Sequence, residues 1–274
     1  MTNSVVMPTI WVMAVVLCVL LVIRIVLLIR MRGPGHRTGF RQTCGTRQVQ
    51  EDCHAVKKTG KGIMAVLADG MGRNHCGAVS SSMTVETALD IFSQGDAFYN
   101  PNYFFQKTLH QANRRILDRL DDGAGGASAA LVLIEGLTLY YAIVGNVQVA
   151  VFRGDELTPI TEGHTVNVLA EKRYCQGSLT KQETIAFLRE QRLYNFVGSD
   201  SFRDVEVFDQ PIKLRRGDTV VIMTDGVYDA VPHTKLEDML GSGRNCQRRT
   251  DAIVAAVDAA SGERDNASVL LLAV

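Results

Sequence analysis

A long apolar segment near the N-terminus constrains this chain more than any other feature. Over residues 5–29 the sequence reads VVMPTIWVMAVVLCVLLVIRIVLLI, in which Arg24 is the only charged residue. A bilayer core of about 30 Å needs roughly 20 apolar residues in a helix, so this segment is long enough to cross it. Arg24 lies near the end of the segment, where a long side chain can extend toward the headgroups. We therefore predict a single transmembrane helix over residues 5–29, after a short tail of residues 1–4.

The charges that flank this segment predict its orientation. No basic residue precedes it, and four arginines follow it: Arg30, Arg32, Arg37 and Arg41. A cleavable signal peptide usually has a basic region before a shorter apolar stretch, so we favour a membrane anchor over that alternative. Basic residues are retained on the cytoplasmic side of a membrane. We therefore expect the rest of the chain to lie in the cytoplasm.

Charge and cysteine content exclude other classes. The 29 Lys and Arg residues equal the 29 Asp and Glu residues, which argues against nucleic-acid binding through a large positive surface. The cysteines show no CxxC pair and no repeated spacing, so they suggest neither zinc nor a disulfide framework. We interpret them as free thiols in a reducing compartment; they are Cys18, Cys44, Cys53, Cys76, Cys175 and Cys246.

The rest of the chain reads as a basic linker, residues 30–39, and one domain, residues 40–274. Apolar runs separated by short turns predict strands at 53–57, 63–68, 127–134, 137–144, 147–153, 204–211, 219–224 and 267–274. Helical spacing predicts helices at 78–92, 103–120, 164–173, 180–190, 234–240 and 246–260. Strands grouped in hairpins with paired helices between them favour an α+β fold. We predict a four-layer α-β-β-α sandwich of two antiparallel sheets flanked by helices.

Acidic residues occur at the predicted strand ends, often beside glycine. Asp69 ends IMAVLAD and precedes Gly-Met-Gly, Asp225 ends VVIMTD and precedes a glycine, and Asp265 opens DNASVLLLAV. Glu51 and Asp52 lie at the start of the first predicted strand of the domain. Carboxylates beside a glycine carbonyl can hold a hard cation. Asp-Gly is also a common turn dipeptide, so each position taken alone favours a turn, and only their joint occurrence favours a cation site.

Six short motifs follow one another in residues 40–274. They are GTRQVQED at 45–52, DGMGRNHCG at 69–77, GASA at 126–129, VGNVQ at 144–148, TDGVYD at 224–229 and DNAS at 265–268. In this order they resemble the metal-dependent protein phosphatases of the PPM, or type 2C, family, and are most similar to its bacterial members. That family has the patterns G-x-R-x-x-N-E-D, D-G-M-G-G-x-x-x-G, G-[TS]-[TS]-A, G-D-S-R, S-D-G-x-x-D and D-N-[AI]-[ST]. Each motif is weak alone, and their common order makes the resemblance specific.

The resemblance implies a serine/threonine phosphatase with two Mn²⁺ or Mg²⁺ ions. The ions would activate a water molecule that attacks the phosphorus of phosphoserine or phosphothreonine. Arg47 would bind the phosphate oxygens with its planar set of donors, and Asp69 would bridge the two ions. The carbonyl of Gly70 would add a ligand. The remaining ligands implied are Asp225 and Asp265 for one ion, and Glu51 and Asp52 for the other, directly or through water.

Several positions depart from the family patterns. Asn146 replaces an Asp that helps bacterial relatives bind a third ion, and an amide oxygen is a poorer ligand, so a third ion is doubtful. Gln50 replaces an Asn and Arg73 replaces a Gly. His164 falls in a segment that the family also has, and we interpret it as structural.

Two functions remain open from the sequence. The first is a membrane-anchored phosphatase that acts on phosphorylated proteins, with a cognate membrane-bound serine/threonine kinase as a further partner. The second is a non-catalytic phosphoprotein-binding or scaffold domain of the same fold, suggested by the departures at Asn146, Gln50 and Arg73. Retention of Asp69, Asp225 and Asp265 favours the enzyme.

Overall fold

The computed structural model describes residues 16, 17, 19–21, 24, 37–120, 124–243 and 245–274. The chain forms two compact units, Met1–Gly35 and His36–Val274, which are described separately.

The described residues of the first unit, 16, 17, 19–21 and 24, are helical and exposed. Most of the predicted transmembrane helix over residues 5–29 lies outside the described residues, as do the tail at 1–4 and most of the linker. Within the part of the chain that the structure describes, no helix combines the length and apolar character needed to cross a membrane.

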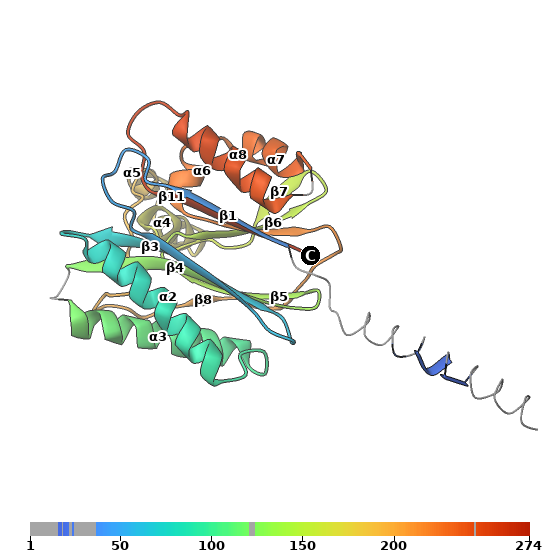
Figure 1. The fold of residues 1–274 in the computed structure, drawn as a ribbon. Coiled ribbons are helices and arrows are strands. Elements are labelled where there is room, and N and C mark those ends of the chain that lie inside the picture. The colour runs from blue at the N-terminus through green and yellow to red at the C-terminus, as the bar shows by residue number, and fades with distance from the viewer. Residues whose placement is uncertain (1–15, 18, 22–23, 25–36, 121–123, 244) are drawn as a thin grey trace, which may run out of the picture. The chain divides into compact units, whose positions relative to one another are not determined.

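Two antiparallel sheets form the centre of the second unit (Figure 1). The first has the strand order β1-β11-β10-β6-β7, and the second has the order β2-β3-β4-β5-β8, with β9 also paired to β5. The first sheet consists of β1 Arg37–Thr43, β6 Gln148–Arg153, β7 Glu156–Pro159, β10 Thr219–Met223 and β11 Ala267–Ala273. The second consists of β2 Asp52–Lys58, β3 Ile63–Gly72, β4 Gly125–Glu135, β5 Thr138–Val144, β8 Glu206–Val207 and β9 Ile212–Lys213.

Helices cover the outer face of each sheet. The second sheet packs against α2 Cys76–Gln94 and α3 Pro101–Arg119, and the first packs against α7 His233–Gly241 and α8 Cys246–Asp258. Three further helices are α4 Val166–Cys175, α5 Lys181–Phe187 and the short α6 Asp225–Tyr228. The predicted α+β sandwich, with helices outside two antiparallel sheets, is confirmed (Figure 1).

Alternating side chains explain why both faces of the sheets are buried. In β3, Met64 and Val66 pack toward α2 and α3, whereas Ile63 and Leu67 face the other sheet. Adjacent residues of a strand point to opposite faces, so a continuous apolar run can serve two cores. All three hydrophobic clusters lie inside the unit His36–Val274.

The domain begins earlier than the sequence suggested. Residues 37–39, which we assigned to the linker, belong to β1, which pairs with β11 from Arg37 to Thr43. Gly39 is not a linker glycine: a Cβ there would lie 2.4 Å from the backbone carbon of Cys246 in α8. The helix crosses this strand too closely for any side chain.

The five cysteines in the described part of the chain are free, as predicted: Cys44, Cys53, Cys76, Cys175 and Cys246. Cys18 lies outside the described residues.

Candidate active site

Acidic residues from both sheets lie at one end of the sandwich. Asp52 begins β2 and pairs with Asp69 in β3. Asp225 follows the end of β10, and Asp265 lies just before β11, the antiparallel neighbour of β10. The hydroxyl of Thr224 donates a hydrogen bond to Oδ2 of Asp52 at 3.3 Å, which links the two sheets at this end. The fold therefore gathers carboxylates that are far apart in the sequence.

These carboxylates raise one another's pKa values. Burial raises the pKa of Asp52 to about 7. Burial, followed by the charges of Asp52, Asp225 and Asp265, raises the pKa of Asp69 well above its usual value. Burial and the charge of Asp265 also raise the pKa of Asp225. The ionised cluster is therefore unfavourable by itself, and a bound cation would stabilise it.

The donor atoms present fit a hard divalent cation. The Oδ1 atom of Asp52 is buried without a hydrogen-bond partner among the described residues. Carboxylate and backbone carbonyl oxygens are the ligands that Mg²⁺ and Mn²⁺ prefer. In residues 37–120, 124–243 and 245–274, no three His, Cys, Asp or Glu side chains are arranged as a ready-made metal site. Binding would therefore require small adjustments, or ligands such as water and the Gly70 carbonyl.

Glu51 lies against the end of β3 and the start of α2. The N–H of Gly70 donates to the backbone carbonyl of Glu51 at 3.2 Å. A Cβ on Gly70 would lie 2.1 Å from the carbonyl oxygen of Gly77, and a Cβ on Gly77 would lie 2.7 Å from Oε1 of Glu51. Only glycine allows three backbone segments to approach this closely. The spacing of Gly70 and Gly77 in DGMGRNHCG thus brings Glu51 beside Gly70.

Arg47 lies at the open edge of the carboxylate cluster. Its Nη2 donates to Oδ2 of Asp265 at 2.8 Å, and both side chains are more than half exposed. The hydrogen bond to Asp265 raises the pKa of Arg47, so the guanidinium stays charged. Arg73, in contrast, lies on the exposed loop after β3.

Asn266 positions the loop that carries Arg47 and Glu51, a role that the sequence analysis did not assign. Its Nδ2 donates to the carbonyls of Cys44 and Val49 at 3.1 and 3.0 Å, and its Oδ1 accepts from the N–H of Glu51 at 2.7 Å. The DNAS motif contains this residue, but only the fold shows which segment it binds.

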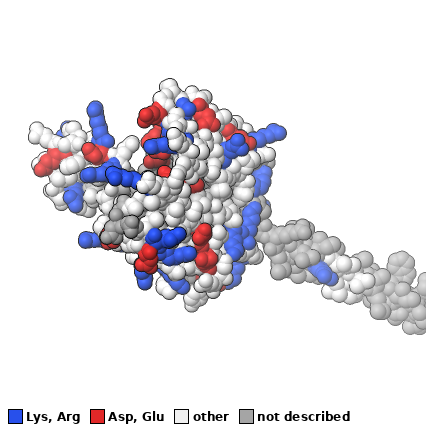
Figure 2. Space-filling view, turned by 60° about the vertical axis from the view of Figure 1, so that its left-hand side comes forward, with Lys and Arg blue, Asp and Glu red and all other residues white. Residues whose placement is uncertain are grey.

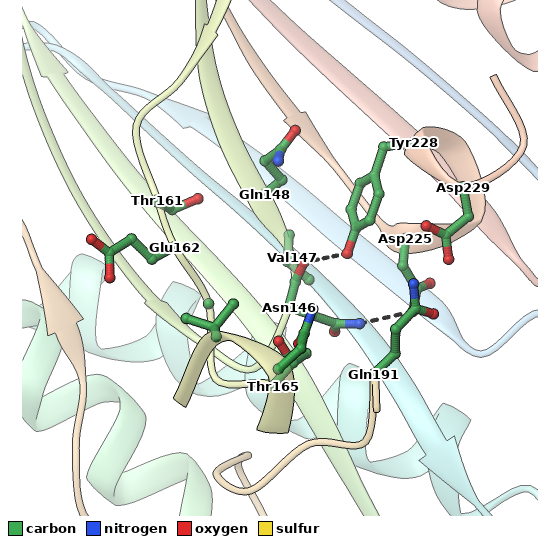
Figure 3. A pocket seen from close by; sticks show the side chains of 13 residues that line it. Asn146, Val147, Gln148, Thr161, Glu162, Thr165, Gln191, Asp225, Tyr228 and Asp229 are labelled. Carbon is green, nitrogen blue, oxygen red and sulfur yellow. Dashed lines mark hydrogen bonds between the residues drawn. The ribbon is translucent and has the colours of Figure 1, made fainter. Parts of the chain in front are cut away.

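Asn146 contacts the cluster directly (Figure 3). Its Nδ2 donates to Oδ2 of Asp225 at 2.8 Å, and its Oδ1 accepts from the hydroxyl of Ser128 at 2.8 Å. The hydroxyl of Tyr228 donates to the backbone carbonyl of Asn146 at 3.0 Å. The amide therefore supplies a hydrogen-bond donor to a part-buried carboxylate at the position where the pattern G-D-S-R has an acid.

His164 holds the turn that presents Asn146. Its ring Nδ1 accepts from the backbone N–H of Gly145 at 3.1 Å, and the backbone N–H of His164 donates to the carbonyl of Gly145 at 2.8 Å. Burial lowers the pKa of His164 to about 4, so the ring is neutral and can accept this hydrogen bond near pH 7. The structure agrees with our interpretation of His164 as structural.

Replacing Asn146 with Asp should lower the stability of the metal-free protein and strengthen Mn²⁺ binding. The change removes the donor to Asp225 and places a second carboxylate against it, which we expect to cost about 1–3 kcal/mol without metal. A carboxylate is also the better ligand for Mn²⁺. Thermal unfolding in EDTA and a Mn²⁺ titration measure the two effects.

Asn146→Ala provides the control, because it loses the donor without adding a charge. It should reduce stability in EDTA without strengthening Mn²⁺ binding. If Asn146→Asp leaves the Mn²⁺ titration unchanged, this position has no influence on metal binding.

A cleft opens beside the cluster, with a volume of about 900 Å³. It is lined by polar and small residues from the loops around α6 and after α8, among them Arg47, Asp225, Asp229, Ala260, Glu263 and Asp265. Figure 2 shows basic and acidic side chains interspersed over much of one face of the domain. The cleft places Arg47 beside the carboxylates of Asp225 and Asp265.

Comparisons with known proteins agree with this geometry. Residues 42–260 match the family model described as protein phosphatase 2C. The serine/threonine phosphatase stp of Listeria monocytogenes is 25% identical over 216 residues, which cover 76% of this chain and 83% of that protein.

Solved structures share the fold. The serine/threonine phosphatase of S. agalactiae has a TM-score of 0.74 at 21% identity, over 87% of this chain and 99% of its own. The catalytic domain of the phosphatase PstP, solved with two manganese ions, has a TM-score of 0.64 at 20% identity, over 87% of this chain and 97% of that chain. Because these chains are covered almost completely, the unit His36–Val274 corresponds to a complete fold.

Proposed function

Because this chain belongs to the protein phosphatase 2C family, we propose that it hydrolyses phosphoserine and phosphothreonine in proteins with a water molecule activated at a binuclear Mn²⁺ or Mg²⁺ centre. The observation that carries this proposal is the group of carboxylates Asp52, Asp69 and Asp225, whose pKa values are raised by loss of solvent and by neighbouring carboxylates. Such a group destabilises the domain unless it binds cations.

The positions of the donors suggest how two ions would be held. Asp69 would bridge them, and the carbonyl of Gly70 would be a further ligand. Asp225 and Asp265 would serve one ion, and Glu51 and Asp52 the other. When bound, the ions would lower the pKa of a water molecule and neutralise charge on the phosphoryl group. The two manganese ions reported for PstP support the same number here.

The protein's own residues position the substrate and the ligands. Arg47 is held at the edge of the cluster by Asp265 and offers several donors to the phosphate oxygens. Asn146 orients the Asp225 carboxylate, and Thr224 orients that of Asp52. The cleft beside Arg47 leaves room for the peptide that carries the phosphate.

The alternative, a scaffold domain without turnover, rests on the departures from the family motifs. Gln50 is accommodated in the fold: its Nε2 donates to the carbonyl of Thr43 and its Oε1 accepts from the N–H of Asp52, both at 3.1 Å. Arg73 is exposed. Neither substitution removes a carboxylate, and Asn146, which replaces one, leaves Asp52, Asp69 and Asp225 in place, so the enzyme remains the better hypothesis.

An assay of residues 33–274 distinguishes the two functions. With p-nitrophenyl phosphate and a phosphothreonine peptide as substrates, we expect turnover with Mn²⁺ that EDTA abolishes. The absence of metal-dependent turnover throughout about pH 6 to 9 would favour the scaffold.

We also propose that residues 5–29 anchor the phosphatase in the cell membrane with its domain in the cytoplasm. The apolar length and the arginines that follow support this location. A kinase in the same membrane would then be a natural source of its substrates.

Deleting residues 1–32 should move the enzyme from the membrane fraction to the soluble fraction without loss of activity. The domain unit His36–Val274 contains both sheets and every residue of the candidate site. Fractionation followed by a phosphatase assay measures this effect. For the full chain, protease added outside intact spheroplasts should leave the domain whole, and its digestion would reverse the proposed orientation.

A further inference from the structure

A second pocket, rich in arginine, lies at the other end of the first sheet. Its volume is about 920 Å³, and it lies between the start of β1, the β6–β7 turn, the turn before β10, the α7–α8 loop and the end of β11. The antiparallel strands β6 and β10 connect this end of the sheet with the end that carries the candidate active site. We call it the arginine pocket after five of its residues: Arg37, Arg153, Arg215, Arg216 and Arg249.

The charge of this pocket is not balanced. Two aspartates, Asp155 and Asp218, also line it. Asp218 is buried and forms an ion pair with Arg153, whose Nη2 and Nε donate to the two carboxylate oxygens of Asp218 at 2.7 and 3.1 Å. Within the described part of the chain, the other four arginines form no ion pair.

Asp218 also fixes the turn that presents two of these arginines. Its Oδ2 accepts from the N–H of Arg215 at 2.7 Å. Arg215 and Arg216 are both exposed on this turn. The local structure therefore holds two cations at the rim, where a large anionic partner can reach them.

Arg249 lies deeper and lacks a partner for one donor. Its Nη1 donates to the hydroxyl of Thr219 at 3.2 Å and its Nη2 to the carbonyl of Gly243, but its Nε is buried without an acceptor among the residues that the structure describes. Burial, and to a lesser extent the charge of Arg37, lower its pKa. An anion bound here would meet several unneutralised guanidinium groups at once.

The location of the pocket favours one anionic partner. The chain enters the domain at Arg37, on the rim of the pocket. The predicted membrane segment ends about eight residues earlier. Eight residues of fully extended chain reach at most about 29 Å. We propose that the arginine pocket binds the phosphate headgroups of anionic phospholipids, so that this end of the domain rests on the bilayer. The choice of lipid rests on the proposed membrane location.

Vesicle binding by residues 33–274, which lack the anchor, tests the proposal. The protein should bind phosphatidylcholine vesicles that contain phosphatidylglycerol, and not vesicles of phosphatidylcholine alone, and high salt should weaken the binding. The double variant Arg215→Gln/Arg216→Gln should bind at least about tenfold more weakly, because each arginine near an anionic surface contributes appreciably.

The matched control removes the same charge from another surface. Arg114 and Arg119 are exposed on α3, which covers the second sheet, and Arg114→Gln/Arg119→Gln should bind vesicles like the unchanged domain. Both variants should keep the turnover of p-nitrophenyl phosphate, which shows that they fold. Equal weakening in both variants, or no binding by the unchanged domain, would overturn the proposal.

Two further measurements complete the test. Calorimetric binding of inorganic phosphate without any vesicle binding would assign the pocket to a soluble anion and overturn the choice of lipid. Hydrogen exchange of the unchanged domain with phosphatidylglycerol vesicles should slow in residues 213–219 and 245–249, and unchanged exchange there would contradict the proposal even if the variant does not fold. Turnover and fractionation test the proposed function separately.

Discussion

Asp69→Asn should reduce metal-dependent turnover by roughly 10³-fold or more. Loss of an outer-shell partner of a metal ligand usually costs 10–100-fold, and Asp69 is proposed to contact both ions. The substitution keeps the shape of the side chain and removes its charge, so the fold should survive. Assays with p-nitrophenyl phosphate over a range of Mn²⁺ concentrations measure the effect. Asp238→Asn, on the exposed side of α7, is the control and should retain normal turnover.

In EDTA, Asp69→Asn should be more stable than the unchanged protein. The pKa of Asp52 is raised to about 7 and that of Asp69 is raised well above its usual value, so the metal-free protein loses stability as the pH rises and these groups ionise. Removing the charge at Asp69 relieves part of this repulsion, by an amount on the order of 1 kcal/mol. With added Mn²⁺, the unchanged protein should become the more stable of the two. Near-normal turnover, or equal stabilisation of both proteins by Mn²⁺, would refute the assignment of Asp69.

Arg47→Ala should reduce kcat/KM by about 10²-fold, since it removes charged donors proposed to bind the phosphate. Arg47 also pairs with Asp265, so a Mn²⁺ titration is needed to separate the loss of phosphate binding from a change at a metal ligand. Arg47→Lys keeps the charge without the planar set of donors and should recover part of the activity. Kinetics at saturating Mn²⁺ measure the effect of each variant.

Arg73→Ala is the matched control, because Arg73 is an exposed arginine of the neighbouring loop. It should change kcat/KM little. If Arg47→Ala behaves like this control, Arg47 does not bind the phosphate.

Much of the sandwich could be predicted from local patterns. The strands of the second sheet carry long apolar runs, since both of their faces are buried. The first strand, β1, was missed because only Gly39 is buried along it, so its sequence shows no apolar alternation. Of the predicted strand over residues 204–211, only the two-residue β8 Glu206–Val207 forms, and β9 Ile212–Lys213 follows directly after Pro211. Proline cannot donate to a strand ladder.

The acidic residues of the site could be identified from their places at strand ends and their order in the motifs. Their contacts could not, because they join segments that only the tertiary fold brings together. Thr224 reaches Asp52 across the two sheets, and Asn146 reaches Asp225 from a different hairpin. Local propensity carries no information on such pairs, so the donor role of Asn146 became visible only in the structure.

The division of the carboxylates between the two sheets has a consequence for the lifetime of the protein. Asp52 and Asp69 belong to one sheet, whereas Asp225 and Asp265 belong to the ends of strands in the other. Ions bound between them would hold the two sheets together. A free ion concentration of about 100 times the dissociation constant would stabilise the closed sandwich by about 2.7 kcal/mol. In a cell short of manganese or magnesium, the halves would separate more often and proteases would cut the chain sooner. Metal supply would then govern how much of this phosphatase persists, as well as how fast each molecule works.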